Sequence, residues 1–533
     1  MKKLSLLILS MMITFFLAGQ TAGTLDLSFG NNGITLTDYS YNGVDNYSYA
    51  SALQADGKII LGGYSVNNLH QNMTFVRYLP DGTLDNTFGD GGIKILLFGG
   101  SDDRLEDLVI QADGKIIAVG YTSNSTNKQM TVTRLNTDGS LDNSFNANGM
   151  TLINFGDSVN AYGRSVALQD DGKIIVGGHI TFTDQDPEIN GAICRLTSSG
   201  VLDNTFGVDG IITHDILSLW NDMTQIAIQD EKIILGGIST RSDDFARFIT
   251  LCRYNPDGSL DTGFGTSGIM SLEIAAGTPG YYESMCLTED GKIIFANSIS
   301  TGWLEHDLAV WRFQSNGFPD NSFGYYGMVT IAMGANSDAN AVALQADGKI
   351  VAAGFYTNPS SGKDDFLLVR YHENGYLDLS FGTEGTGVVV TNASSEIWLS
   401  DQIFSLLIQD DGKLLVSGYA YAESYNVDFA VARYYSGLNI GVETPEQDTR
   451  ELTIFPNPIT EETKLVINLA EESIVKVEVF NAFGTKVTEL TQHSYSEGEH
   501  QFRWDGGDVK AGVYIIKMTV GDMVYTSKVV KAD

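Results

Sequence analysis

The chain has 533 residues, with 58 glycines against 9 prolines, 10% aromatic residues and only 18% charged residues. That length exceeds one ordinary core, and the composition favours many short strands joined by glycine turns over helices or disorder. Acidic residues outnumber basic ones 66 to 32, which gives a formal net charge of −34. Such a surface repels phosphate backbones and anionic lipid, so it argues against a nucleic-acid partner and a membrane-surface role.

The first residues have the pattern of an export signal. Met1-Lys2-Lys3 precede an apolar run from Leu4 to Leu17, and small residues follow as far as Gly23. A charged start, a short apolar run and a small-residue end predict a secretory signal peptide over residues 1–22. The run is shorter than a membrane span needs, and we expect no span in the mature chain.

Residues 23–437 consist of one repeated unit. Its first element, Gln-Ala-Asp-Gly-Lys-Ile-Ile at 54–60, returns with its lysine at positions 58, 115, 173, 232, 292, 349 and 413. Its second element, Leu-Asp-x-x-Phe-Gly, returns with its phenylalanine at positions 29, 88, 145, 206, 264, 323 and 381. Seven copies of each element at a period close to 59 predict a repeat architecture.

Each unit predicts four antiparallel strands. Asp-Gly ends the first strand in a tight turn, and the unbroken apolar run of the second predicts cover on both sheet faces. Four-stranded units buried by like units describe blades of a β-propeller. The chain enters with a second element at Leu25–Gly30 and leaves at Arg433–Gly437 without one. We therefore predict an all-β, seven-bladed propeller that its N-terminal strand closes by completing the last blade.

These units resemble the delta-sixty β-propeller repeat family, whose consensus carries the same Asp-Gly-Ser-Leu-Asp-x-x-Phe-Gly and Gln-x-Asp-Gly-Lys-Ile elements. The resemblance covers residues 24–435 and implies an extracellular or cell-surface propeller without agreed catalytic residues. Two units depart from the pattern. Gln229-Asp230-Glu231-Lys232 lacks the turn glycine and one residue, which predicts a tighter hairpin, and Phe318-Pro319-Asp320 replaces Ser-Leu-Asp.

The tail predicts a second domain. Residues 438–450 read as a polar linker, and residues 451–533 alternate like a small Ig-like sandwich, with strands expected at 464–469, 474–480, 500–504, 513–520 and 523–530. Phe455-Pro456-Asn457-Pro458, Ala511-Gly512-Val513-Tyr514 and Lys528-Val529-Val530-Lys531 resemble the C-terminal sorting domain of the Bacteroidetes type IX secretion system. The resemblance implies that the type IX secretion machinery handles residues 451–533. It also implies export to the outer-membrane surface or into the medium.

One arginine recurs in every unit, at positions 77, 134, 195, 253, 312, 370 and 433. In the first six units an aspartate follows eight residues later, and ring closure would bring Asp26 to Arg433. The arginines could form a ring of anion sites or seven structural pairs that fix the turns. Because a binding site rarely needs seven identical copies, we favour the structural pairs.

No residue pattern predicts a catalytic, cofactor-binding or metal-ligating site. The Asp-Gly hairpins are ordinary turn chemistry, and a calcium ion in the acidic loops remains the open alternative. Three cysteines, at 194, 252 and 286, predict small buried side chains rather than a disulfide. His306-Asp307 near Trp303 is the one loop cluster that hints at a site, and we expect Asp307 to be structural.

The sequence therefore predicts a secreted or cell-surface, non-catalytic and monomeric propeller. The loops Val66–Asn72, Thr122–Lys128, Thr181–Asn190, Thr301–His306 and Asn358–Lys363 vary at one register of the repeat, so they share one face, which would bind a glycan or an extracellular protein. Two alternatives stay open: a structural, adhesin-like module, and an extracellular enzyme of the polysaccharide lyase or hydrolase type. The enzyme would show polar residues unique to one or two blades gathered at the channel mouth.

Overall fold

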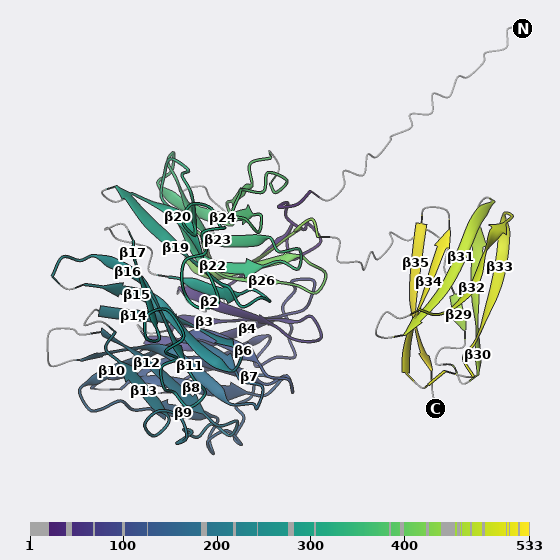
Figure 1. Cartoon of the computed structure of the whole chain (residues 1–533). Coiled ribbons are helices and arrows are strands. Elements are labelled where there is room, and N and C mark those ends of the chain that lie inside the picture. The colour runs from purple at the N-terminus through teal and green to yellow at the C-terminus, as the bar shows by residue number, and fades with distance from the viewer. Residues whose placement is uncertain are drawn as a thin grey trace, which may run out of the picture. The chain divides into compact units, whose positions relative to one another are not determined.

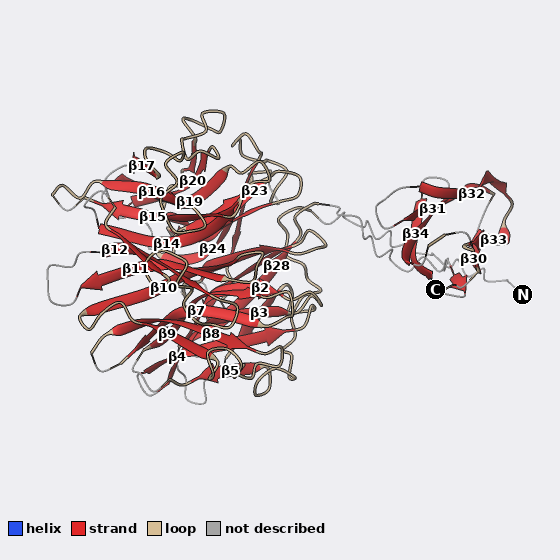
Figure 2. Ribbon diagram, turned by 60° about the horizontal axis from the view of Figure 1, so that its bottom comes forward, coloured by secondary structure: helices blue, strands red, loops and turns tan. Residues whose placement is uncertain are grey.

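The computed structural model describes the chain from residue 21 onward, except for residues 39–44, 68–69, 99–101, 125, 183–188, 217–219, 242, 275–281, 303–304, 383–384, 395–398, 423–425, 439–452, 456–458, 460, 470–471, 482–485, 508, 511, 521–522 and 532–533. The predicted signal peptide and linker therefore fall almost wholly outside the described residues. The described chain contains strands and turns and no helix (Figure 2), which confirms the all-β prediction.

Two compact units divide the chain, Met1–Ile440 and Gly441–Asp533. In the described part of either unit, no helix has the length and apolarity needed to cross a membrane.

The first unit holds seven four-stranded antiparallel sheets among its described residues. The first strands of these sheets are β2 (Asn46–Leu53), β6 (Asp103–Ile110), β10 (Val159–Leu168), β14 (Trp220–Gln229), β18 (Ser284–Leu287), β22 (Ser337–Leu344) and β26 (Gln402–Ile408). The second strands are β3 (Ile59–Asn67), β7 (Ile116–Ser123), β11 (Ile174–Phe182), β15 (Lys232–Thr240), β19 (Ile293–Gly302), β23 (Ile350–Asn358) and β27 (Leu414–Tyr421).

The outer half of each sheet has the same plan. The third strands are β4 (His70–Tyr78), β8 (Lys128–Leu135), β12 (Ile189–Leu196), β16 (Arg247–Tyr254), β20 (Glu305–Phe313), β24 (Lys363–Tyr371) and β28 (Val427–Tyr434). The fourth strands are β5 (Ile93–Leu96), β9 (Met150–Ile153), β13 (Ile211–His214), β17 (Ile269–Ile274), β21 (Met328–Ile331), β25 (Val388–Thr391) and, in the last sheet, β1 (Ile34–Thr37).

The last sheet combines the two ends of the repeat region. β1 pairs antiparallel with β28, with Ile34 opposite Ala432. The first strands contact one another in chain order, and β26 also contacts β2, so the two lie side by side (Figure 1). Phe29, Ile59 and Leu415 share one buried cluster, which means that the first and last sheets pack face to face.

Burial explains why the second strands carry the longest apolar runs. Ile59 to Ser65 of β3 are buried on both faces, because each sheet lies between two others. This confirms the prediction, made from the unbroken apolar run of the second strand, that both faces of each sheet are buried. The turn that precedes each second strand needs Gly at positive φ, for example +80° at Gly57. In the fourth sheet Asp230 and Glu231 adopt positive φ instead, and Gln229 pairs with Lys232, so this hairpin is tighter, as predicted.

The second unit contains seven strands in two sheets among its described residues. One sheet has the order β29 (Thr453–Phe455), β30 (Glu462–Leu469) and β33 (Gly498–Asp505), and the other β32 (Lys486–Tyr495), β31 (Ser473–Asn481), β34 (Gly512–Val520) and β35 (Met523–Lys531). Leu465 and Trp504 of the first sheet pack with Val477 and Ile516 of the second in one core. All five tail strands predicted from the sequence are present, and β29 and β32 were missed.

Candidate functional site

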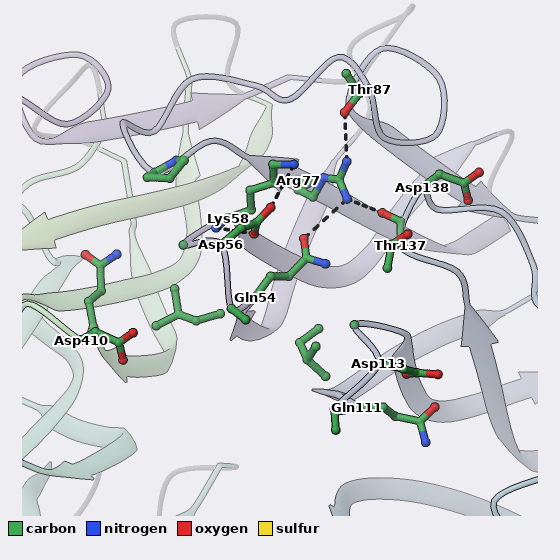
Figure 3. Close-up of a pocket in the computed structure, with 18 of the residues that line it drawn as sticks. Gln54, Asp56, Lys58, Arg77, Thr87, Gln111, Asp113, Thr137, Asp138 and Asp410 are labelled. Atoms are coloured by element: carbon green, nitrogen blue, oxygen red, sulfur yellow. Dashed lines mark hydrogen bonds and ion pairs between the residues drawn. The ribbon is translucent and has the colours of Figure 1, made fainter. Parts of the chain in front are cut away.

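A large pocket lies among the turns that join first and second strands. It measures about 1020 Å³ and is lined by the turns around Asp56, Asp113 and Asp411, together with Arg77 and Arg433 (Figure 3). Its walls are copies of one another: Gln54, Gln111 and Gln409 occupy one repeat position, as the three aspartates do another. The pocket is therefore made of the parts that define the fold.

The repeated arginines in this region make structural contacts within their own sheet and with the next one. Each forms an ion pair with its predicted aspartate at 2.7–2.8 Å, and Arg433 pairs with Asp26. The same guanidinium donates to a turn carbonyl of the next sheet, as from Arg134 to Ser198 at 2.7 Å and from Arg433 to Pro80 at 2.6 Å. It also lies over the repeated phenylalanine, 4.5–4.8 Å from the ring centre. The structural pairing predicted from the sequence is confirmed.

The carboxylates of these pairs are held in the charged form. Burial alone would raise the pKa of Asp203, yet hydrogen bonds from Thr205 and the charge of Arg195 lower it to about 2. The repeated lysine joins the cluster: Lys115 lies 3.0 Å from Asp142 and is about one third exposed. Lys115 therefore neutralises part of the same carboxylate that Arg134 pairs with.

A second cavity, of about 160 Å³, lies between the first strands and is lined from all seven sheets. We call it the central cavity. Six of the seven first strands carry a β-bulge at one repeat position, where an extra residue stands out of the ladder. The residues at this position, including its counterpart before β18, are Tyr49, Glu106, Arg164, Thr224, Glu283, Asn340 and Phe404, and all seven line the cavity.

A glycine of the second strand makes each bulge possible. At Gly63 and Gly120 an added Cβ would overlap the carbonyl oxygen of Tyr47 or Arg104, because the bulge brings the first strand that close. The fifth sheet has Asn297 at this position, and its first strand stops pairing at Ser284 opposite Ala296. Glu283 therefore reaches the cavity from a segment outside the ladder.

An arginine–glutamate–arginine cluster occupies one side of the central cavity. The Glu106 carboxylate, 4% exposed, lies 2.8 Å from Arg104 Nε and 3.1 Å from Arg164 Nη1. Arg104 also donates to the Tyr282 hydroxyl at 3.0 Å and lies over the Tyr49 ring at 4.3 Å. Two arginines share the Glu106 carboxylate here. The neighbouring Asp107 carboxylate also lines the cavity and accepts hydrogen bonds from Ser165 and from the backbone of Leu108 and Val166.

Two further carboxylates near the cavity have opposite protonation tendencies. Burial and the charge of Asp222 raise the pKa of Glu283 to about 8, although Thr224 donates a hydrogen bond to it at 2.8 Å. Burial would also raise the pKa of Asp222, but the charge and hydrogen bond of His179, at 2.9 Å, lower it to about 2. At neutral pH Glu283 is therefore a neutral acid and Asp222 an anion.

Aromatic rings lie beside the arginine–glutamate–arginine cluster. Tyr49 lies 5.0 Å from Phe404 and 5.8 Å from Tyr282, measured between ring centres, and Tyr47 lies 5.0 Å from Tyr419. Tyr49, Tyr282 and Phe404 line the cavity, whereas Tyr47 and Tyr419 lie outside its lining. Burial raises the pKa of Tyr47 and Tyr419 well above the usual tyrosine value, so both hydroxyls stay protonated. Rings beside polar groups form a surface on which the flat face of a sugar can stack.

The structure distributes the other candidates elsewhere. The variable loops do fall at one register, between second and third strands. His306 Nε2 lies 2.8 Å from Asp338 of the next sheet, whereas Trp303 lies outside the described residues. Cys194 and Cys252 are buried free thiols, and Cys286 is a partly buried one. Within the described ranges no three metal-ligating side chains gather as a metal site.

Sequence reasoning missed the cavity residues because it searched the loops. The signal was present in the repeat alignment: the position nine residues before the repeated lysine, eight in the shortened fourth unit, holds six residue types in seven copies. The preceding position is at least as varied but mostly apolar, as at Leu105, Met223 and Ile403, whereas the bulge position is charged or polar in five of the seven copies.

Comparisons with known proteins identify both parts of the chain. Residues 54–88, 111–145, 169–206, 229–264, 345–381 and 409–436 match the family described as "Domain of unknown function (DUF5122) beta-propeller". The matched ranges omit the fifth unit, which carries Asn297 and Pro319. Residues 453–532 match the secretion system C-terminal sorting domain, which indicates export by the type IX secretion system to the cell surface or the extracellular space.

Similar solved structures include a protein of unknown function from Dyadobacter fermentans, with 10% identity, 75% of this chain and 98% of that chain covered, and a TM-score of 0.37. They also include the α-L-arabinofuranosidase Arb93A from Fusarium graminearum, with 10% identity, 76% and 98% covered, and a TM-score of 0.36. No curated protein matches the chain. The chain belongs to the proteins that join DUF5122 β-propeller repeats to a secretion system C-terminal sorting domain.

Proposed function

We propose that this protein is a secreted or surface-displayed, non-catalytic propeller that binds a glycan at its central cavity. The seven sheets form a closed, seven-bladed ring, for which the β1–β28 pairing and the shared cluster of the first and last sheets are the support. The observation that carries the binding proposal is the ring of seven side chains of six types at one bulge position. Five of the seven are charged or polar, from Glu106 to Asn340, and all seven line one cavity.

The chemistry of the cavity favours a sugar over a protein partner. Its volume of about 160 Å³ lies below the usual range for drug-sized ligands, so it would take a terminal sugar residue or one side group. Tyrosine rings supply stacking surfaces, and the side chains of Thr224, Asn340 and Arg164 supply polar groups that can fix hydroxyl positions. The variable loops would then contact the rest of the chain of sugars.

A glycan array probed with the full exported chain tests this proposal. We expect saturable binding to a restricted set of glycans, with no change in the glycan after long incubation. Tyr49 lines the cavity, and Tyr49→Ala should weaken that binding about tenfold or more, because a tenfold loss corresponds to about 1.4 kcal/mol, the size of one stacking contact. Tyr326→Ala is the matched control, since that tyrosine is 68% exposed and lies outside the cavity lining.

An extracellular enzyme is the second candidate, and one observation favours it. Glu283 and Asp222 have pKa values pushed apart to about 8 and about 2, a pattern suited to a general acid and a general base. Product analysis of the bound glycans by mass spectrometry separates the two functions. Cleavage that Glu283→Gln and Asp222→Asn each abolish would replace the binding proposal, whereas intact glycan recovered from a saturated protein would exclude the enzyme.

A further inference from the structure

Arg164 lines the central cavity and has a hydrogen-bond donor that its contact with Glu106 does not use. Its Nη1 lies 3.1 Å from Glu106, while its Nε has no hydrogen-bond partner among the described residues. The side chain is 23% exposed and lines the cavity. An arginine can present several donors to one planar anion, so this guanidinium can bind a ligand without giving up Glu106.

Arg104 fills a different role in the same cluster. Its Nε faces Glu106, its Nη2 donates to Tyr282, and its guanidinium lies over the rings of Tyr49 and Tyr64 at 4.3 and 5.1 Å. These contacts hold Arg104 in place beside the Glu106 carboxylate. Since Arg104 takes up most of the Glu106 contact, Arg164 keeps donor groups that Glu106 does not use.

The groups that face Arg164 tolerate an incoming anion at neutral pH. Glu283 is neutral there, because burial and the charge of Asp222 raise its pKa to about 8, against the opposing charges of Arg164 and Arg247. Asp222 and Asp107 are the other anions nearby. His179 engages Asp222 at 2.9 Å, and Asp107, whose pKa burial raises to about 6, accepts hydrogen bonds from Ser165 and from the backbone of Leu108 and Val166. The protein as a whole, at a net charge of −34, repels anions, so an anion would be held here by direct hydrogen bonds to the Arg164 guanidinium.

We propose that the central cavity recognises the carboxylate of an acidic sugar, a uronic acid residue, with Arg164 as its cation. This rests on the proposed glycan binding and names its ligand class. The sugar ring stacks on the tyrosine side, and its carboxylate accepts hydrogen bonds from the Arg164 guanidinium. Thr224 and Asn340 contribute polar groups on the adjacent walls.

Isothermal titration of the full exported chain with paired ligands tests the proposal. The probes are short uronic acid oligosaccharides, among them oligogalacturonate and oligoglucuronate, each with its carboxyl-reduced neutral counterpart. We expect one acidic probe to bind at least tenfold more tightly than its neutral counterpart. Arg164→Gln should remove this preference, while Arg241→Gln, the same change at an exposed arginine of the first unit, should keep it.

The pH dependence gives a readout that survives if Arg164→Gln fails to fold. Above pH 8 Glu283 ionises and repels the ligand carboxylate, so affinity for the acidic probe should fall between pH 7 and 9 in the natural protein. Glu283→Gln should abolish that fall, and the neutral probe should show none.

The outcomes separate this inference from the proposed function. Equal binding of acidic and neutral probes, or an affinity for the acidic probe that is flat with pH, overturns the acidic-sugar inference and leaves glycan binding intact. Failure of every glycan on the array, acidic or neutral, overturns both. Binding of acidic peptides without any uronic acid would also refute the sugar assignment and point to a protein partner.

Discussion

At the scale of single residues, substitution of the repeated arginine and of a cavity residue should change the free energy of unfolding in different ways. Arg370 and Asp378 are each 2% exposed at their side chains, with 2.8 Å between Nε and Oδ2. Arg370→Ala leaves the Asp378 carboxylate buried with Lys349 at 3.4 Å and His372 at 3.6 Å as the basic groups near it. We expect a loss of about 3–5 kcal/mol in the free energy of unfolding, measured by chemical denaturation.

An exposed arginine and the double variant provide the comparison. Arg241→Ala removes an ion pair whose partners are 39% and 52% exposed, and it should cost under about 1 kcal/mol. Arg370→Ala combined with Asp378→Ala should recover part of the loss, because the uncompensated charge is gone. Equal losses for Arg370→Ala and Arg241→Ala would contradict the buried-pair account.

Glu283 should leave a signature in the pH dependence of stability. In the folded protein its pKa is about 8, against 4.5 for the free side chain, so the folded state retains a proton that the unfolded state has lost. Folding stability contributed by this group therefore falls as the pH rises from about 4.5 to 8. The side chain in Glu283→Gln does not ionise. Relative to the natural protein, the free energy of unfolding of Glu283→Gln should therefore increase over that pH range by on the order of 1–3 kcal/mol.

Urea unfolding of both proteins at pH 5, 6, 7 and 8 measures the effect. Asp138→Asn is a control at an exposed carboxylate outside the cavity, and its stability difference should not grow over this range. A difference between Glu283→Gln and the natural protein that is constant with pH would show that Glu283 ionises normally.

At the scale of elements, the bulge in the first strand requires the glycine in the second strand. Ala normally suits a strand better than Gly by roughly 0.5–1 kcal/mol. At Gly120 the sign should reverse, because the new methyl group would overlap the Arg104 carbonyl oxygen. We expect Gly120→Ala to destabilise the protein by about 2 kcal/mol or more and to weaken ligand binding, since Glu106 sits on the same bulge.

Gly302 in β19 supplies the contrast. An added Cβ there meets only the side chain of Glu305, at 3.3 Å, so Gly302→Ala should be close to neutral. Thermal unfolding and titration of both variants check the pair. A stable Gly120→Ala with full binding would mean that the bulge accommodates a side chain and that glycine there has another cause.

The elements also mark the boundary of what the sequence can predict. Periodicity and turn chemistry predicted the four-strand unit, the arginine–aspartate ties and the tighter hairpin at Asp230, because each depends on neighbours along the chain or one repeat away. Strand β32 was missed because its residues are mostly exposed and show little alternation. The bulge residues escaped because their grouping depends on seven sheets meeting, a relation that no single unit contains.

At the scale of the whole molecule, the N-terminal segment is the part on which the first unit depends most. β1 pairs with β28, and Asp26 accepts a hydrogen bond from the Arg433 guanidinium. Phe29 is fully buried between the last and first sheets. A chain without residues 21–37 should lose these contacts at once and leave β28 as an open edge. We expect its melting temperature to fall by on the order of 10 °C or more, since 1 kcal/mol shifts a large domain by roughly 2–4 °C.

Removal of the second unit provides the matched comparison for that deletion. A chain ending at residue 440 lacks about 90 residues, yet the first unit retains all of its sheets and buried clusters. Its melting temperature should therefore stay that of the first unit in the full chain, recorded by calorimetry. An unchanged melting temperature of the N-terminally shortened chain would mean that β1 contributes nothing to stability. The seven sheets would then form an open array, because in a closed ring the first strand of the chain is part of the last sheet.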